Sequence, residues 1–149
     1  MGYTTEFEGN ISIDKPLDDD TYDLLVGLSN TRRMKRNIEG YGIEGEFYIK
    51  GSGFMGQDRD STVIDYNSPP TTQPSLWLQW IPTEDRQFIE WNEGEKFYYS
   101  EEWMGYIIDK ILAPNGYLCN GEIIAQGEEM DDRWKLVVEN NVVRRENLR

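Results

Sequence analysis

The sequence predicts a single α+β domain over residues 1–149, with a mostly antiparallel sheet, two helices packed on it and one long ordered loop. Three observations predict this fold. Short stretches with apolar residues at every second position lie beside turn residues, as in antiparallel hairpins. Two longer stretches carry apolar residues at helical spacing. The chain has 149 residues, including 5 Trp, 9 Tyr and 5 Phe, which is enough large apolar material for one core.

The first third of the chain is expected to contain a strand, a helix and a second short strand. Apolar and polar residues alternate up to Asp14, which predicts a strand with one buried face. The acids Asp18–Asp20 are suited to begin a helix. The basic run Arg32–Arg36 would complement the dipole at the end of that helix; the alternative is a patch for a ligand or partner. A glycine-rich loop over 37–45 and a strand over Glu46–Lys50 should follow.

The middle of the chain is expected to form a hairpin followed by the second helix. Leu76–Ile81 reads as a strong strand and Phe88–Trp91 as its antiparallel partner, with Lys96–Tyr99 as a short extended piece. Ser100 is placed to cap a helix over Glu101–Leu112, whose apolar residues include Trp103, Ile107 and Ile111 at intervals of four.

The last third is expected to be a series of antiparallel strands. After the helix-ending run Pro114-Asn115-Gly116, Tyr117–Gly127 reads as a strand with a bulge or a bend at Asn120-Gly121. Trp134–Glu139 should pair back onto it, and Asn140-Asn141 signals a tight turn into Val142-Val143.

The composition excludes several classes of chemistry. The chain has no histidine, which removes Ser-His-Asp and Cys-His nucleophile systems and any histidine-bound metal. Its one cysteine, Cys119, permits neither an internal disulfide nor a four-cysteine zinc site, and it is interpreted as a small buried residue of a strand. We therefore expect no cofactor, no metal and no catalytic residue of these kinds. No stretch is apolar for long enough to cross a membrane, and the first ten residues do not resemble a signal peptide, so a cytoplasmic location is expected.

The net charge of −13 bears on the partners that the chain could bind. Such a chain is repelled by nucleic-acid phosphates and by anionic lipid, so neither direct nucleic-acid binding nor membrane binding is expected. The opposite possibility is that the acidic surface imitates nucleic acid. The charge is low for that role when it is spread over a whole globule.

The segment Gly51–Pro74 is the most irregular part of the chain and is expected to be an ordered loop lying across the sheet that carries Trp77 and Trp80. It begins with a Gly-x-Gly-x-x-Gly motif, but the acids that follow would repel a phosphate, so dinucleotide binding is not expected. The candidate ligand- or partner-binding residues of this segment are Phe54, Gln57, Asp58, Arg59, Asp60, Asp65 and Tyr66. Asp58, Asp60 and Asp65 could instead hold Mg²⁺ or Ca²⁺, or could bond their own loop backbone.

The tryptophans and a group of glutamates complete the set of candidates. Trp77 and Trp80 lie three apart, so in a strand they would point to opposite faces, and only one could enter the core. The other would be covered by a helix, by the loop, or by a ligand or partner. Glu90, together with Glu93 and Glu95, brackets Trp91, a pattern that is found in paired-carboxylate enzymes and also at ordinary charged hairpin ends.

Several segments spread over nearly the whole chain form a specific combination: Gly2–Phe7, Thr31–Met34, Gly51–Asp58, Asp65–Asn67, Gln73–Trp80, Glu90-Trp91, Glu95–Tyr98 and Asn120–Glu122. With these segments the chain resembles an uncharacterised family of small proteins encoded by T4-type phages, with bacterial relatives. The resemblance implies a phage-encoded protein in the host cytoplasm. It implies no activity and no catalytic residue.

The sequence therefore favours a non-enzymatic binding protein that acts on a host or phage protein through its acidic surface and the region 51–80. One alternative is a small carboxylate-based enzyme or metal-binding protein that uses Asp58, Asp60, Asp65 and Glu90 or Glu93. A second alternative is a nucleic-acid mimic.

Overall fold

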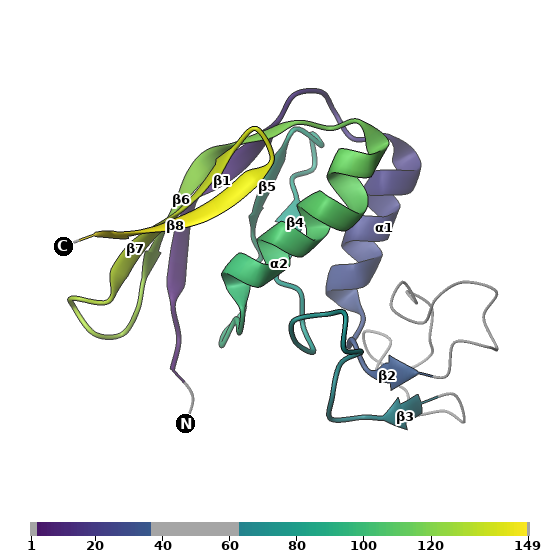
Figure 1. Ribbon diagram of the computed structural model, residues 1–149, viewed down its shortest axis with the longest axis horizontal. Helices are drawn as coiled ribbons and strands as arrows, with labels where there is room; N and C mark the ends of the chain where they lie inside the picture. The colour runs from purple at the N-terminus through teal and green to yellow at the C-terminus, as the bar shows by residue number, and fades with distance from the viewer. Residues whose placement is uncertain (1–2, 37–62, 149) are drawn as a thin grey trace.

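Six strands form one antiparallel sheet in the order β4-β5-β1-β6-β7-β8 in the computed structural model of the chain (Figure 1). The structure describes residues 3–36 and 63–148. In chain order the strands of this sheet are β1 (Glu6–Ile13), β4 (Trp80–Pro82), β5 (Phe88–Trp91), β6 (Cys119–Gln126), β7 (Arg133–Glu139) and β8 (Val142–Leu148). The predicted antiparallel sheet with two helices is confirmed.

Strand β1 lies at the centre of the sheet and pairs with β5 on one side and β6 on the other. Its inward residues Ile11 and Ile13 are buried, whereas its outward residues Glu8 and Asn10 are exposed. The pairing with β6 runs without a register shift, so there is no bulge at Gly121. Two glycines permit the close approach of these strands, because a Cβ at Gly9 would lie 2.8 Å from a carbonyl oxygen of β6, and a Cβ at Gly121 would lie 2.8 Å from one of β1.

Helix α1 (Asp19–Asn30) begins where the acidic run predicted. The Asp18 carboxylate caps it by accepting a hydrogen bond of 2.7 Å from the backbone N–H of Thr21. The helix ends earlier than expected, because Thr31 is extended. The placement of the run Arg32–Arg36 at the end of the helix was therefore wrong: its last two residues form strand β2 (Lys35–Arg36), and Arg33 and Arg36 are buried.

Helix α2 (Ser100–Ile107) continues into a π-helical turn over Ile108–Leu112 and a 3₁₀ turn over Ala113–Asn115. The predicted span is therefore helical, although not α-helical throughout. Ser100 is the first helical residue and not the cap, which is Tyr99 in a left-handed conformation. Gly116, with a φ of 84°, ends the helical run as expected.

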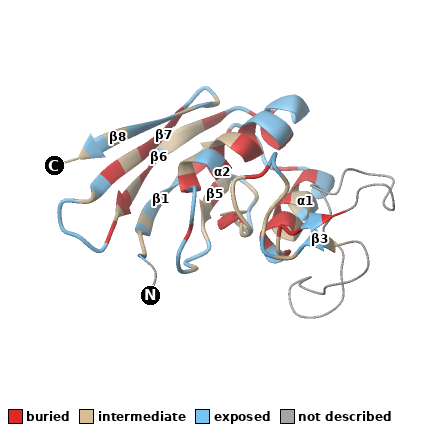
Figure 2. Cartoon of the chain, turned by 60° about the horizontal axis from the view of Figure 1, so that its bottom comes forward, coloured by how far each residue is buried: buried red, intermediate tan, exposed pale blue. Residues whose placement is uncertain are grey.

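The core lies between the helices and one face of the sheet (Figure 2). Helix α2 contacts both β4 and β8, which are the two edges of the sheet, so the sheet curls around this helix. The rings of four other aromatic residues surround Phe7 in edge-to-face contacts, with centroids 5.0 to 6.2 Å from its own; these residues are Trp80, Trp91, Phe97 and Trp134. Cys119 is buried in β6, as predicted.

The hairpin of β7 and β8 turns at Asn140 and Asn141, whose φ angles of 49° and 69° fit the predicted tight turn. Charged residues line the outer face beside it. The Nζ of Lys135 lies 3.3 Å from a carboxylate oxygen of Glu122 and 3.7 Å from one of Glu146.

Two predicted strands of the middle region differ from the structure. Of the strand expected over Leu76–Ile81, only residues 80 and 81 join the sheet, as part of β4, and residues 76–79 are irregular. The short piece expected to be extended over Lys96–Tyr99 is irregular, with left-handed φ angles at Lys96 and Tyr99. The strand expected over Glu46–Lys50 lies outside the described residues.

The second half of the predicted loop is described, and it begins as a strand. Strand β3 (Val63–Asp65) pairs with β2 as a separate ribbon beyond the carboxyl end of α1 (Figure 1). This ribbon does not lie across the main sheet, and Ile64 is 62% exposed. Residues 51–62 of the loop lie outside the described residues. In the described part of the chain, no helix is both long and apolar enough to span a bilayer.

Candidate functional site

A cleft of about 580 Å³ lies between two irregular segments, residues 67–79 and residues 95–99. Its lining consists mainly of aromatic, proline and amide side chains: Asn67, Pro69, Pro74, Ser75, Leu76, Trp77, Gln79, Glu95, Lys96, Tyr98 and Tyr99. The volume is within the range of about 300–1,000 Å³ that is usual for ligand sites.

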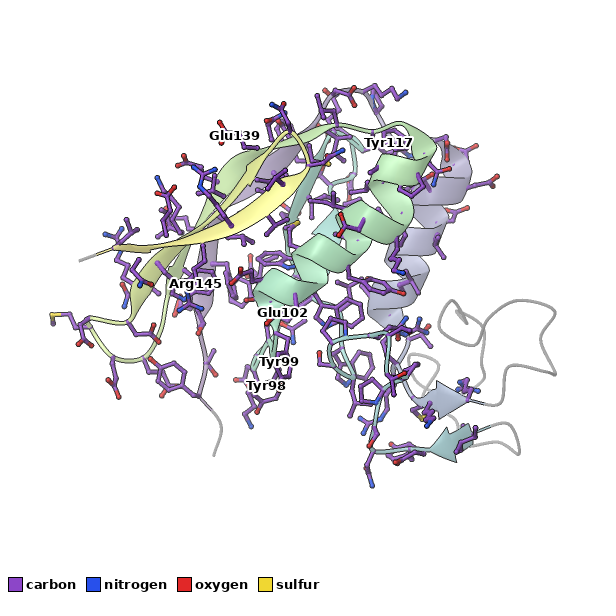
Figure 3. The ribbon with its side chains drawn as sticks, in the orientation of Figure 1. Tyr98, Tyr99, Glu102, Tyr117, Glu139 and Arg145 are labelled. Atoms are coloured by element: carbon purple, nitrogen blue, oxygen red, sulfur yellow. The ribbon has the colours of Figure 1, made fainter. Side chains whose placement is uncertain are left out.

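Three aromatic rings of this cleft are open to solvent. Trp77 is half-buried, and Tyr98 and Tyr99 are 56% and 60% exposed. Figure 3 shows the two tyrosines together just before the first turn of α2, on which Glu102 lies. Exposed aromatic residues gathered at a concave surface are typical of binding sites.

Gln79 joins the two walls of the cleft. Its side-chain Nε2 donates a hydrogen bond of 2.9 Å to the carbonyl oxygen of Glu95, and its Oε1 accepts one of 3.2 Å from the indole of Trp91. Its backbone carbonyl accepts a further bond of 3.0 Å from the backbone N–H of Asn92. Because Gln79 is buried, these bonds set the distance between the walls with little competition from water.

Ser75 joins the first wall to helix α2. Its Oγ accepts a hydrogen bond of 2.7 Å from the indole Nε1 of Trp103 and lies 3.3 Å from the carbonyl oxygen of Tyr98. Trp103 is fully buried, so the indole is a rigid anchor for the serine. The Nε2 of Gln73 makes a second link to α2, at 3.1 Å from the hydroxyl of Tyr106.

The segment after α1 supports the first wall from the other side. The backbone N–H of Arg33 donates to the carbonyl oxygen of Leu76 at 2.8 Å, and that of Lys35 donates to Ser68 at 2.9 Å. The guanidinium of Arg32 lies over the ring of Tyr66, 4.3 Å from its centroid. The basic run that was expected to end a helix thus holds a wall of the cleft.

The second wall has an unusual backbone. Glu93, Lys96 and Tyr99 have φ angles of 66°, 56° and 59°, in the left-handed region that residues other than glycine rarely adopt. Such conformations persist only where the surrounding contacts impose them, and they are concentrated at functional sites. Here the hydrogen bonds from Gln79 and Ser75 supply those contacts.

Charge is unevenly distributed around the cleft. Residues 67–79 contain no charged side chain, and residues 95–99 contain Glu95 and Lys96, whose charges cancel. The longer segment 90–102, which includes the second wall, contains five glutamates and one lysine, a net charge of −4. This acidic segment therefore attracts cations and repels phosphates and carboxylates.

Of the sequence-predicted candidates within residues 63–148, Trp77 is the one that lines the cleft. Trp80 is fully buried, with its indole donating to the carbonyl oxygen of Ser100 at 2.8 Å. Glu90 is half-buried in β5 opposite Ile81, and Trp91 pairs with Trp80. One tryptophan of the pair thus enters the core and the other lines the cleft, although residues 76–79 are not a strand.

The candidates of the predicted loop lie in two groups. Asp65 accepts a hydrogen bond of 2.9 Å from the backbone N–H of Asn67, the local loop bond that was weighed against metal binding. Tyr66 lies under Arg32. The remaining five candidates lie outside the described residues: Phe54, Gln57, Asp58, Arg59 and Asp60.

The sequence did not point to Tyr98, Tyr99, Pro69, Pro74, Gln79, Glu95 or Lys96 as site residues. A usable signal was present in the adjacent pair Tyr98-Tyr99, two large aromatic residues directly before a helix and outside its apolar spacing. Glu95 was noted only as one of three acids at a hairpin end.

Two features of the described residues bear on catalysis: the spacing of possible metal ligands and the reactivity of Cys119. Among residues 3–36 and 63–148, no three Asp, Glu or Cys side chains converge to hold a metal ion. Burial, together with the nearby Asp14, raises the pKa of the Cys119 thiol from 9.0 to about 11, so this group is a poor nucleophile. The metal-based alternative thus depends on Asp58 and Asp60.

The chain was compared with protein-family models, curated proteins and solved structures, and none of them matches it.

Proposed function

We propose that this chain is a binding protein that holds a segment of a protein partner in the cleft between residues 67–79 and 95–99. The observation that supports the proposal is the group of three solvent-accessible rings, Trp77, Tyr98 and Tyr99, around one cleft. Tryptophan and tyrosine contribute most to protein interfaces, because they bury a large area with few rotatable bonds.

The lining of the cleft suits binding better than catalysis. Among the described residues that line it, Glu95 is the one carboxylate, and Lys96, which follows it in the chain, is the one amine, so there is no pair of carboxylates. A pair of such groups is the usual requirement for acid–base chemistry. The proposed function is therefore recognition without a chemical step.

The support of the walls favours a site that is formed before its partner arrives. Part-buried hydrogen bonds made by Gln79 and Ser75 hold both walls in the free protein. A preformed site loses less conformational entropy on binding, which strengthens the affinity for a given contact area. Following the resemblance, the partner would be a protein of a phage or of its host.

Photo-crosslinking tests the proposal. A photoreactive phenylalanine analogue placed at Tyr98 should give a discrete crosslinked protein band in cells that make the chain. The same analogue at Met130, which is 92% exposed on the β6–β7 turn, is the matched control and should not give that band.

A variant without the Trp77 ring completes the experiment. Adding Trp77→Ala to the Tyr98 probe should abolish the band while the protein still melts cooperatively. A band that appears equally from Tyr98 and Met130, or that survives Trp77→Ala, would contradict binding in the cleft.

A further inference from the structure

We propose that the occupant of the cleft is an extended, proline-containing segment of the partner, with a basic residue beside the prolines. This inference rests on the proposed function and names the chemistry of its ligand. Three properties of the cleft lead to it: the shape of its apolar groups, its free hydrogen-bond donors and its charge.

The apolar groups of the cleft are flat and rigid. Trp77, Tyr98 and Tyr99 contribute rings, and Pro69 and Pro74 contribute pyrrolidine faces. Aromatic-lined grooves bind polyproline II segments, because successive proline rings pack against flat surfaces and the ligand is already extended before binding. A volume of about 580 Å³ accommodates a short segment and not a folded domain.

The free polar atoms of the rings match the backbone of such a segment. Among the described residues, the indole Nε1–H of Trp77 and the hydroxyls of Tyr98 and Tyr99 have no hydrogen-bond partner, whereas Trp80, Trp91 and Trp103 donate within the protein. A polyproline II segment makes no internal hydrogen bonds, so its carbonyl oxygens are available as acceptors. Proline itself has a carbonyl and no N–H, so it needs donors and offers none.

The charge near the cleft favours a basic residue beside the prolines of the bound segment. Glu95 and Lys96 both lie in the lining, and the segment 90–102 that carries them has a net charge of −4. The opposite wall carries no charged side chain. An arginine or lysine next to the prolines would therefore be attracted by the acidic segment 90–102, and the net charge of −13 would speed the approach of a basic partner.

Nuclear magnetic resonance of the indole N–H groups tests this inference on the whole chain. The probe is a short oligoproline peptide with an arginine at each end. One control peptide carries glutamates in place of the arginines, and a second keeps the arginines but replaces the prolines with glycine and serine. Trp77→Phe identifies the Trp77 indole signal by its loss, while it keeps a ring in the cleft.

We expect the probe peptide to shift the Trp77 indole signal, and to leave those of Trp80 and Trp103 in place because both are buried and internally bonded. Each control peptide should bind at least about tenfold more weakly, which corresponds to about 1.4 kcal/mol. Tyr98→Phe and Tyr99→Phe, which lose only a hydroxyl, should weaken the probe as well. Equal binding by the glycine–serine peptide would overturn the inference, because attraction would then depend on charge alone.

Competition separates this inference from the proposed function. If the probe peptide displaces the protein crosslinked at Tyr98, the inference is supported. If the crosslink forms and depends on Trp77 but the peptide does not displace it, the inference is overturned while the proposed function stands. If neither the crosslink nor peptide binding is observed, both are overturned.

Discussion

The indole Nε1 of Trp103 donates a hydrogen bond of 2.7 Å to the Oγ of Ser75, so a serine hydroxyl joins the wall of the cleft to the helix behind it. Replacing Ser75 with alanine would leave a buried indole donor without its acceptor. We expect Ser75→Ala to lower the free energy of unfolding by about 1–3 kcal/mol, measured by denaturant titration. In a Trp103→Phe background, where no donor remains, the same replacement should cost much less; equal costs in both backgrounds would show that the bond is unimportant.

Replacement by alanine should have opposite effects on stability at Gly9 and at Gly105. At Gly9, with a φ of 114°, an added Cβ would meet the carbonyl oxygen of Glu122 at 2.8 Å, whereas at Gly105 nothing lies within 4 Å. We expect Gly9→Ala to destabilise the protein by about 1–3 kcal/mol. Gly105→Ala, inside α2, should stabilise it by about 0.5–1 kcal/mol. Thermal unfolding of the two variants should thus shift in opposite directions, and a shift in the same direction would contradict the strand geometry at Gly9.

The Asp18 cap of α1 predicts that the stability of the protein falls at acidic pH. The hydrogen bond from the backbone N–H of Thr21 holds the pKa of the Asp18 carboxyl below its ordinary value of 3.8. The unfolded chain therefore takes up this proton first as the pH falls, so the stabilisation is present above about pH 4 and is lost below it. Asp18→Asn keeps a capping oxygen that does not titrate, so it should lose less stability between about pH 5 and pH 3 than the parent chain does. Melting temperatures of both proteins over this range would check it, and parallel curves would refute it.

The buried thiol of Cys119 predicts that the stability of the protein depends on pH in the alkaline range. The folded thiol keeps its proton up to about pH 11, whereas the unfolded thiol loses it near its ordinary pKa of 9.0. Between these values the unfolded state binds fewer protons, so stability falls as the pH rises, by about 1–3 kcal/mol over the whole range. Relative to Cys119→Ala, which lacks the titrating group, the parent chain should lose its advantage between about pH 9 and pH 11. A thiol reagent should react with the native protein only as fast as it unfolds; rapid reaction at neutral pH would contradict burial.

The strands that could be predicted from the sequence are those whose apolar residues alternate. Strands β1, β6 and β7 are examples, because each has buried residues on the face that lies toward the core. Residues 76–79 show where this reasoning stops. They have the composition of a buried strand, but their backbone carbonyls accept hydrogen bonds from Arg33 and Asn92, neither of which lies in a strand.

The prediction that the basic run Arg32–Arg36 ends helix α1 was wrong for a related reason. Helix-dipole arguments place positive residues in the last helical turn, but α1 ends at Asn30 and has no basic residue there. Long-range pairing of Lys35 with Ser68 and Asp65 draws the chain into an extended conformation. Local preference cannot reveal a partner that lies about thirty residues away in the sequence.

Only part of the cleft lining could be predicted from the sequence. Trp77 was identified because two tryptophans three apart cannot both enter one core. Tyr98 and Tyr99 were not, because their position depends on the left-handed backbone at Lys96 and Tyr99, and nothing in these residue types predicts that conformation. The bonds that Gln79 and Ser75 make to the carbonyl oxygens of Glu95 and Tyr98 come from residues distant in the sequence.

The two edges of the curled sheet have a consequence for how the protein behaves at high concentration. The β4 edge is three residues long and ends in Pro82, whose nitrogen has no hydrogen to donate to a further strand. The β8 edge is seven residues long, and Arg144, Arg145 and Glu146 occupy its middle. Short edges, proline and charged side chains are the features that prevent sheets from growing into fibrils. Growth of the main sheet by addition of a further strand at β4 or β8 should therefore be disfavoured.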